Sequence, residues 1–282
     1  MRASESREPS CLYDQASFRA AAGGELRPGG LELTGELAEV CGLTAGRRVL
    51  DLGCGVGSTA LYLARVWGAV VTGLDVSAEH LREARAREVR EREASGRETG
   101  QCQDGHERAF GPRSGSCGSR LPCAPVTWVQ GQAEHVPLPE DSFDAVFAEC
   151  FLTQLDDPRQ ALLEAHRVLR PGGRLAVSDL YLRNPPHATP THSLPSTTCL
   201  HGAVGRDMVL SRLEESGFAP LFWRDRSEVL TRFLAQMVFA YGSVAGFWQA
   251  ALGGAPAAAC SLTREKVTAA KPGYFLLVAE CR

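Results

Sequence analysis

The feature that most constrains the fold is an apolar segment that runs directly into a glycine-rich turn, Arg48 to Gly57 (RVLDLGCGVG). It predicts a buried strand, and the helical pattern of residues 58–67 begins immediately after the last glycine. Glycine lacks a Cβ, so its backbone can take a positive φ and approach a ligand closely. The first N–H groups of the helix have no partner within the helix. The stretch therefore predicts a ligand cradle at the carboxyl end of a strand in an open α/β sheet, with Asp51 beside it.

Two cofactor classes fit this turn. The segment Gly55 to Ala60 matches the dinucleotide pattern G-x-G-x-x-G/A, and Asp75 follows at a suitable distance for a ribose hydroxyl. The longer run Asp51-x-Gly53-x-Gly55-x-Gly57 is more specific and resembles the first motif of class I methyltransferases that use S-adenosylmethionine (SAM). A carboxylate would repel a pyrophosphate but favours the amino group of SAM. The turn therefore favours SAM over a nicotinamide dinucleotide.

Predicted strands and helices alternate along the rest of the chain. Helices are expected at 31–41, 58–67, from Ser77 onward, 157–169 and 207–216, and strands at 48–52, 69–75, 126–129, 143–148, 174–182, 221–224 and 274–279. This alternation predicts an α/β fold, doubly wound (Rossmann-like), with a mostly parallel seven-stranded sheet and helices on both faces. The two strands near the end have no standard crossover between them, so we expect the last strand to be antiparallel.

The domain organisation follows from composition. Residues 1–30 are polar and predict a flexible N-terminal segment, and residues 31–282 predict a single domain. Residues 95–124 are rich in Gly, Ser and Arg with almost no aliphatic side chains, so they predict a disordered insertion. The four Cys and His residues within it match no compact zinc pattern, and no metal site is expected. Residues 226–255 predict a helical insertion.

Composition also bounds the partners and the compartment. The 282 residues carry a net charge of −3, which argues against a nucleic acid as partner. No run is apolar and long enough to span a membrane, and the polar first ten residues lack the apolar core of a signal peptide. We expect a cytoplasmic protein whose ten cysteines are free thiols or ligands. The sequence does not indicate an oligomeric state.

The blocks VLDLGCGVG, DSFDAVFAEC and LRPGGRLAVSDL together resemble class I SAM-dependent methyltransferases of the type 11 group, over roughly residues 31–225 and the last strand. The resemblance implies that Asp75 binds the ribose hydroxyls. It places Gln132 and Ala133 beside the adenine, where the family usually has Asp-Ala. The implied cofactor-binding residues are Asp51, Gly53, Cys54, Gly55, Gly57, Asp75, Val76, Gln132, Ala133 and Glu149.

Within that group, two segments are similar to the branch of quinone-ring and arsenite methyltransferases. Residues 149–152 (ECFL) resemble the Asn-Cys-Val-Ile segment of the arsenite enzymes, and residues 199–203 (CLHGA) resemble their Cys-Leu-Gly-Gly-Ala segment. The further cysteine of those enzymes would fall at Ala60 in this chain. Cys54 or Cys41 could substitute for it, and the sequence does not decide this.

These resemblances lead to an expected reaction and to alternatives. We expect transfer of the SAM methyl group to a small-molecule acceptor, with Cys150 and Cys199 holding a trivalent arsenic-type species and Tyr13 closing over the sulfonium. The alternative is an organic, quinone-like molecule methylated on carbon or oxygen, with Glu149 or His201 as general base. An NAD(P)-dependent oxidoreductase and a SAM-binding module without catalysis are more distant alternatives.

Overall fold

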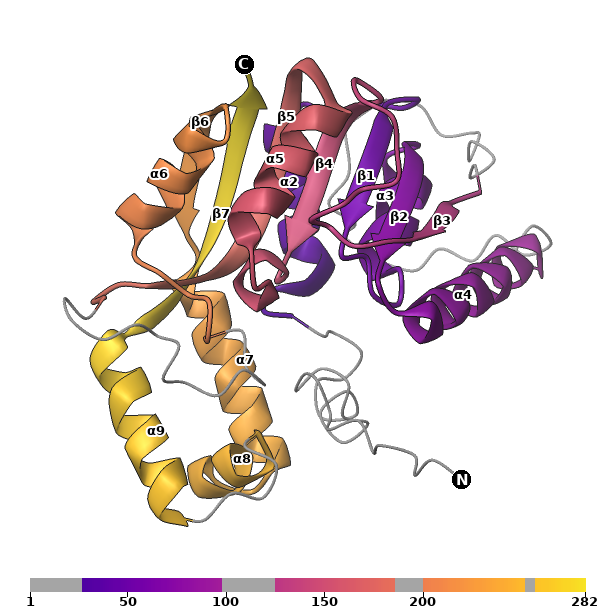
Figure 1. The fold of residues 1–282 in the computed structure, drawn as a ribbon. Coiled ribbons are helices and arrows are strands. Elements are labelled where there is room, and N and C mark those ends of the chain that lie inside the picture. The colour runs from indigo at the N-terminus through magenta and orange to yellow at the C-terminus, as the bar shows by residue number, and fades with distance from the viewer. Residues whose placement is uncertain (1–26, 98–124, 186–199, 252–256) are drawn as a thin grey trace, which may run out of the picture.

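The computed structural model describes residues 27–97, 125–185, 200–251 and 257–282. Seven strands form one sheet in the order β3-β2-β1-β4-β5-β7-β6 (Figure 1). The strands are β1 (Arg48–Leu52), β2 (Val70–Asp75), β3 (Thr127–Gln130), β4 (Phe143–Glu149), β5 (Leu169–Leu182), β6 (Phe218–Asp225) and β7 (Pro272–Cys281). Strand β7 runs antiparallel to both of its neighbours, and the pairs between β1, β2, β3, β4 and β5 are parallel. The predicted fold class and the antiparallel last strand are confirmed.

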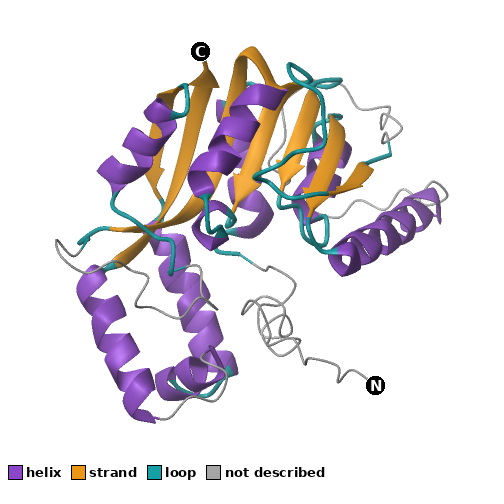
Figure 2. Cartoon of the chain, in the orientation of Figure 1, coloured by secondary structure: helices purple, strands orange, loops and turns teal. Residues whose placement is uncertain are grey.

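Helices cover both faces of the sheet (Figure 2). The described helices are α2 (Gly30–Val40), α3 (Ser58–Val66), α4 (Ala78–Arg97), the 3-10 helix η3 (Leu152–Gln154), α5 (Pro158–Val168), α6 (Arg206–Glu215), α7 (Ser227–Ala240), α8 (Val244–Ala251) and α9 (Ala257–Ala270). Among these helices, none is long and apolar enough to cross a membrane. The predictions for Tyr13, Cys199 and most of the 95–124 insertion fall outside the described residues.

Alternate residues of the buried strands face two separate apolar layers. Val49 packs in the layer formed with α2 and α3, whereas its neighbour Leu50 packs in the layer formed with α5. Successive side chains of a strand point to opposite faces, so a strand covered on both faces is apolar throughout. Strand β1 shows this burial from Val49 to Leu52. The carboxylate of Asp51 therefore lies at the end of a strand buried on both faces.

The parallel strands end at one edge of the sheet, and α7, α8 and α9 extend beyond that edge (Figure 1). Strand pairing places the two ends of this helical segment at that edge. Asp225, at the end of β6 before α7, lies opposite Phe275, and Pro272, at the start of β7 after α9, lies opposite Leu182 at the end of β5. The helical insertion therefore lies on the side of the sheet where ligands of open α/β folds bind.

The largest boundary differences from the sequence-based prediction are in β5, β6 and the helical insertion. Strand β5 begins at Leu169 rather than at residue 174, because Leu169 pairs with Phe143 before the register shifts around the Pro-Gly-Gly segment. Strand β6 extends to Phe218 and Asp225 on either side of the predicted 221–224. The helical insertion continues through α9 to residue 270 rather than ending at 255.

Candidate active site

The glycine turn between β1 and α3 is tightly enclosed. Gly57, at the start of α3, has φ +81°, and a Cβ there would lie 2.5 Å from the ring of Trp128. Gly53 has φ +76°, and a Cβ there would lie 2.2 Å from the ring of Phe151. A side chain at either position would meet both an unfavourable backbone conformation and an occupied space. The turn therefore requires glycine at both positions.

Asp75 connects the end of β2 to this turn through hydrogen bonds. Its carboxylate accepts hydrogen bonds from the backbone N–H groups of Gly55 and Ser77, both at 2.8 Å, and lies 3.5 Å from Nδ1 of His80. Burial alone would raise the pKa of Asp75, but the bonds from His80, Ser77 and Gly55 hold it below its ordinary value. Asp75 is therefore an ionised acceptor at the rim of the turn.

Three further predicted cofactor-binding residues, Val76, Gln132 and Ala133, lie near Asp75. The N–H of Gly131 donates to the Asp75 carbonyl at 3.1 Å, which brings the segment after β3 to the end of β2. Gln132 is exposed and bridges to His135, Ala133 is buried, and Val76 is 63% exposed. The structure thus brings these predicted residues to the same edge as Asp75.

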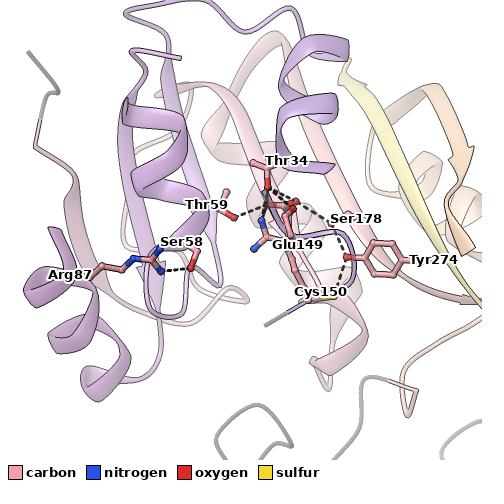
Figure 3. Close-up of polar contacts among 10 residues, drawn as sticks. Thr34, Ser58, Thr59, Arg87, Glu149, Cys150, Ser178 and Tyr274 are labelled. Carbon is pink, nitrogen blue, oxygen red and sulfur yellow. Dashed lines mark hydrogen bonds and ion pairs between the residues drawn. The ribbon is translucent and has the colours of Figure 1, made fainter. Parts of the chain in front are cut away.

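Glu149, at the end of β4, has its carboxylate surrounded by donors. The Thr59 hydroxyl donates to it at 2.7 Å and the Ser178 hydroxyl at 3.2 Å, while the Thr34 hydroxyl lies at 3.0 Å. Figure 3 shows these three hydroxyls converging on Glu149. Arg27 forms an ion pair with it at 3.0 Å, and only 2% of the Glu149 side chain is exposed. The carboxylate joins α2, α3, β4 and β5 and has little capacity left to take a proton from an acceptor.

Asp51 has a different environment, although it lies close to the same charges. It is 2% exposed, and its Oδ2 atom is buried without a hydrogen-bond partner. Burial and the nearby Glu149 raise the pKa of Asp51 to about 8, and Arg27 opposes this only in part. A buried acceptor without a partner costs free energy unless a ligand satisfies it. Asp51 therefore fits a donor group of a ligand at the turn.

Cys150 follows Glu149 directly and begins a chain of hydrogen bonds. Its sulfur lies 3.1 Å from the Tyr274 hydroxyl, and that hydroxyl donates to Ser178 at 3.1 Å. Ser178 in turn donates to Glu149, so the Cys150 thiol is the group left to donate to Tyr274. Burial raises the pKa of the Cys150 thiol above its ordinary value. Cys150 is held as a protonated thiol, with an unusual positive φ of 50°.

The other two cysteines considered from the sequence lie elsewhere. Cys54 is buried in the glycine turn, where burial raises the pKa of its thiol, and its sulfur lies 3.8 Å from the Gly55 carbonyl. Cys41 is half-buried at the end of α2, and burial raises its pKa to about 12. Within the part of the chain that the structure describes, no group of three His, Cys, Asp or Glu residues could hold a metal ion.

The segment before α6 packs against η3. Gly202 lies against the Thr153 backbone, because a Cβ there would come 2.3 Å from the Thr153 carbonyl oxygen. Thr153 is held by Asp179, which accepts from its hydroxyl at 2.6 Å and from its N–H at 3.1 Å. This contact places His201 next to the η3 segment that follows Cys150.

Five residues of the polar network were not predicted as site residues: Arg27, Thr34, Thr59, Ser178 and Tyr274. One signal for two of them was available, because Thr34 and Thr59 are polar positions on otherwise apolar helix faces. Both are buried, at 0% and 4% exposure. Arg27 and Tyr274 gave no local signal, since only the fold brings residues so distant in the chain together.

The comparison with known families decides the assignment. Residues 50–177 match a protein-family model that is described as a methyltransferase domain. The matched region is a methyltransferase domain of the class I SAM-dependent type. The matched residues run from β1 into β5 and include Asp51, the glycine turn, Asp75 and Glu149. The sequence-based assignment of the family is confirmed, and the dinucleotide alternative is not supported.

Individual proteins give the same result. The methyltransferase GfsG of Streptomyces halstedii is 35% identical over 158 residues, which are 56% of this chain and 46% of that protein. The 27-O-demethylrifamycin SV methyltransferase of Amycolatopsis mediterranei is 32% identical over 150 residues, 53% of this chain and 44% of that protein. The methyltransferase chain thus spans about half the length of the curated relatives it matches.

A solved structure extends the likeness to nearly the whole methyltransferase chain. The [4+2]-cyclase SpnF has a TM-score of 0.64 and 26% identity, with 94% of this chain and 91% of that chain covered. Because that neighbour is named as a cyclase, the fold by itself does not decide the reaction. The reaction must be argued from the site.

Proposed function

We propose that this chain transfers the methyl group of SAM to an organic small molecule. The observation that carries the proposal is the arrangement around the glycine turn: Asp75 is an ionised acceptor, and Asp51 keeps one buried oxygen, Oδ2, without a hydrogen-bond partner. SAM carries ribose hydroxyls that suit Asp75 and an ammonium group that suits Asp51. When bound, SAM supplies a methyl group already activated by its sulfonium.

The remaining residues of the SAM site would position and enclose the cofactor. The N–H groups at the start of α3 face the turn, and Val76, Gln132 and Ala133 would border the adenine. The protein then has to orient the acceptor and exclude water rather than generate a strong nucleophile. The phenyl ring of Phe151 lies against Gly53 and would help to exclude water from this space.

An organic acceptor fits the chemistry of Cys150 better than a trivalent arsenic species does. The thiolate, not the thiol, is the ligand for a soft ion, and the Cys150 thiol is protonated and bonded to Tyr274. Cys199 lies outside the described residues. Relatives whose names include an acceptor, such as the 27-O-demethylrifamycin SV methyltransferase, are named for organic molecules. The thiol-bound arsenic acceptor therefore remains an unsupported prediction.

His201 is the residue we assign as general base for an acceptor hydroxyl. Glu149 is the other residue predicted for this role, but its oxygens already accept from three hydroxyl groups and Arg27. His201 directly precedes Gly202, which packs on Thr153 of η3, so it lies near the segment that follows Cys150. A histidine side chain can act as a general base. In this scheme His201 would accept the proton of the acceptor hydroxyl. Bound SAM would supply the methyl group, with the carbon–sulfur bond broken and S-adenosylhomocysteine as the leaving group.

The test is an acceptor screen with SAM that carries a deuterated methyl group, read by mass spectrometry. The panel should contain polyketide-type hydroxyls, quinols, phosphoethanolamine and arsenite, with wild-type protein and Cys150→Ser. We expect labelled organic product from both proteins, because serine keeps a donor for Tyr274. A product with arsenite alone that Cys150→Ser fails to form would overturn the organic acceptor in favour of the thiol site.

A further inference from the structure

Two charged side chains near Glu149 each leave one buried atom without a hydrogen-bond partner. These atoms are Nε of Arg27, a donor, and Oδ2 of Asp51, an acceptor. Native proteins pair nearly all of their buried polar atoms, because an unpaired one costs free energy. A donor and an acceptor left open in one charged cluster therefore indicate a ligand that carries both complementary groups.

The two side chains belong to one cluster of charges. The Arg27 guanidinium lies 3.0 Å from a carboxylate oxygen of Glu149, and the exposed fractions of the two side chains are 14% and 2%. Thr59, in the first turn of α3, donates to the same oxygen at 2.7 Å, which brings Glu149 next to the turn that Asp51 precedes. Asp51 and Arg27 are close enough for each charge to shift the pKa of the other.

The position of Arg27 is fixed by the backbone that follows it. Pro28 restricts its own φ, and Gly29 takes a φ of +75° at the start of α2. A Cβ on Gly29 would lie 2.4 Å from the buried side chain of Leu33. After this Pro-Gly turn, the Arg27 side chain lies against Glu149 at the end of β4 and is only 14% exposed. The conformation of the turn therefore helps to hold Arg27 at this position.

The charges of the cluster indicate the class of group that completes it. With both carboxylates ionised, Asp51, Glu149 and Arg27 sum to one negative charge. An α-amino acid group offers a carboxylate to accept from Arg27 and an ammonium to donate to Asp51. The methionine part of SAM is such a group, and its sulfonium adds the positive charge that neutralises the cluster.

We propose that Arg27 binds the carboxylate of the methionine moiety, opposite Asp51, which accepts from its ammonium. This inference rests on the proposed function, since it assumes that the ligand is SAM. Arg27 does not reach the reacting atoms in this scheme. It is a binding and positioning residue that fixes one end of the cofactor.

The test compares two ligands that differ only in the amino acid portion. Methylthioadenosine shares the nucleoside and the sulfur of S-adenosylhomocysteine but lacks its carboxylate and ammonium. We expect Arg27→Gln to weaken S-adenosylhomocysteine binding by about tenfold or more, as for loss of a bond to a charged group, and to leave methylthioadenosine binding unchanged. Titration calorimetry measures both. Arg47→Gln is the matched control, because Arg47 forms an exposed ion pair with Asp144.

The outcomes separate this inference from the proposed function. If Arg27→Gln lowers the affinity for both ligands equally, or for neither, Arg27 does not bind the carboxylate and the inference fails. If the wild-type protein binds neither ligand, the proposed function itself fails. Arg27→Lys keeps the charge and covers the case in which the Gln variant does not fold. It should retain a preference for S-adenosylhomocysteine over methylthioadenosine, and loss of all preference with intact folding would also contradict carboxylate binding by a cation here.

Discussion

Asp51→Asn removes one buried titrating group while it keeps the shape of the side chain. In the wild-type protein, burial and Glu149 raise the pKa of Asp51 from 3.8 to about 8. The unfolded chain ionises this carboxyl near pH 4, so between about pH 4 and 8 the folded protein holds one proton more than the unfolded chain. The contribution of Asp51 to stability is therefore full below about pH 4 and is lost as the pH rises towards 8.

The magnitude follows from this difference of one proton. The free energy of unfolding should fall by about 1.4 kcal/mol per pH unit at most, or about 3 kcal/mol between pH 5 and 7. Other titrating groups contribute equally to wild type and Asp51→Asn, so their difference isolates Asp51. The assay is urea unfolding followed by circular dichroism at about pH 5, 6 and 7, without cofactor.

Added S-adenosylhomocysteine extends the same experiment. An ammonium group opposite Asp51 favours the ionised carboxylate, so saturating ligand should flatten the pH dependence of the wild-type protein. The variant should show no such change. Parallel pH profiles for wild type and Asp51→Asn without ligand would refute the raised pKa of this buried carboxyl.

Three further changes test other parts of the site. Asp75→Ala should weaken binding of S-adenosylhomocysteine by about tenfold or more, because the ribose hydroxyls lose a charged acceptor; unchanged affinity in calorimetry would remove Asp75 from the site. Gly57→Ala should lower the free energy of unfolding by about 2 kcal/mol or more, because φ is +81° and the Cβ would meet Trp128; an unchanged urea midpoint would contradict that crowding. His201→Asn should lower kcat on a hydroxyl acceptor by about a hundredfold with unchanged cofactor affinity, and an unchanged kcat would exclude it as the base.

The fold could be predicted from local patterns because most elements carry their own signal. The apolar strand before Gly53, the alternation of strands and helices, and the closing antiparallel pair follow from hydrophobic periodicity and glycine placement. The α9 helix (Ala257–Ala270) was missed, because its Ala-rich sequence carries little amphipathic pattern. The Pro-Gly-Gly segment predicts a turn before the strand, whereas Leu169 ahead of it already pairs with Phe143.

The site was predictable only where its residues belong to a contiguous motif. Asp75 and the glycines lie in such motifs, and the structure brings them together. The partners of Glu149 come from Arg27, Thr34, Thr59 and Ser178, and no local rule links positions so far apart in the chain. Their meeting depends on strand order and on the packing of α2 and α3. The roles given to Tyr13 and Cys199 fall outside the described residues and stay predictions.

The central claim is that the chain moves the SAM methyl group to an organic acceptor. The most direct measurement follows the deuterated methyl group from SAM through the acceptor panel and quantifies S-adenosylhomocysteine alongside the labelled product. The claim predicts equal amounts of S-adenosylhomocysteine and one labelled organic molecule, both dependent on the acceptor. Binding of SAM without any S-adenosylhomocysteine, or methyl transfer to arsenite alone, would contradict it.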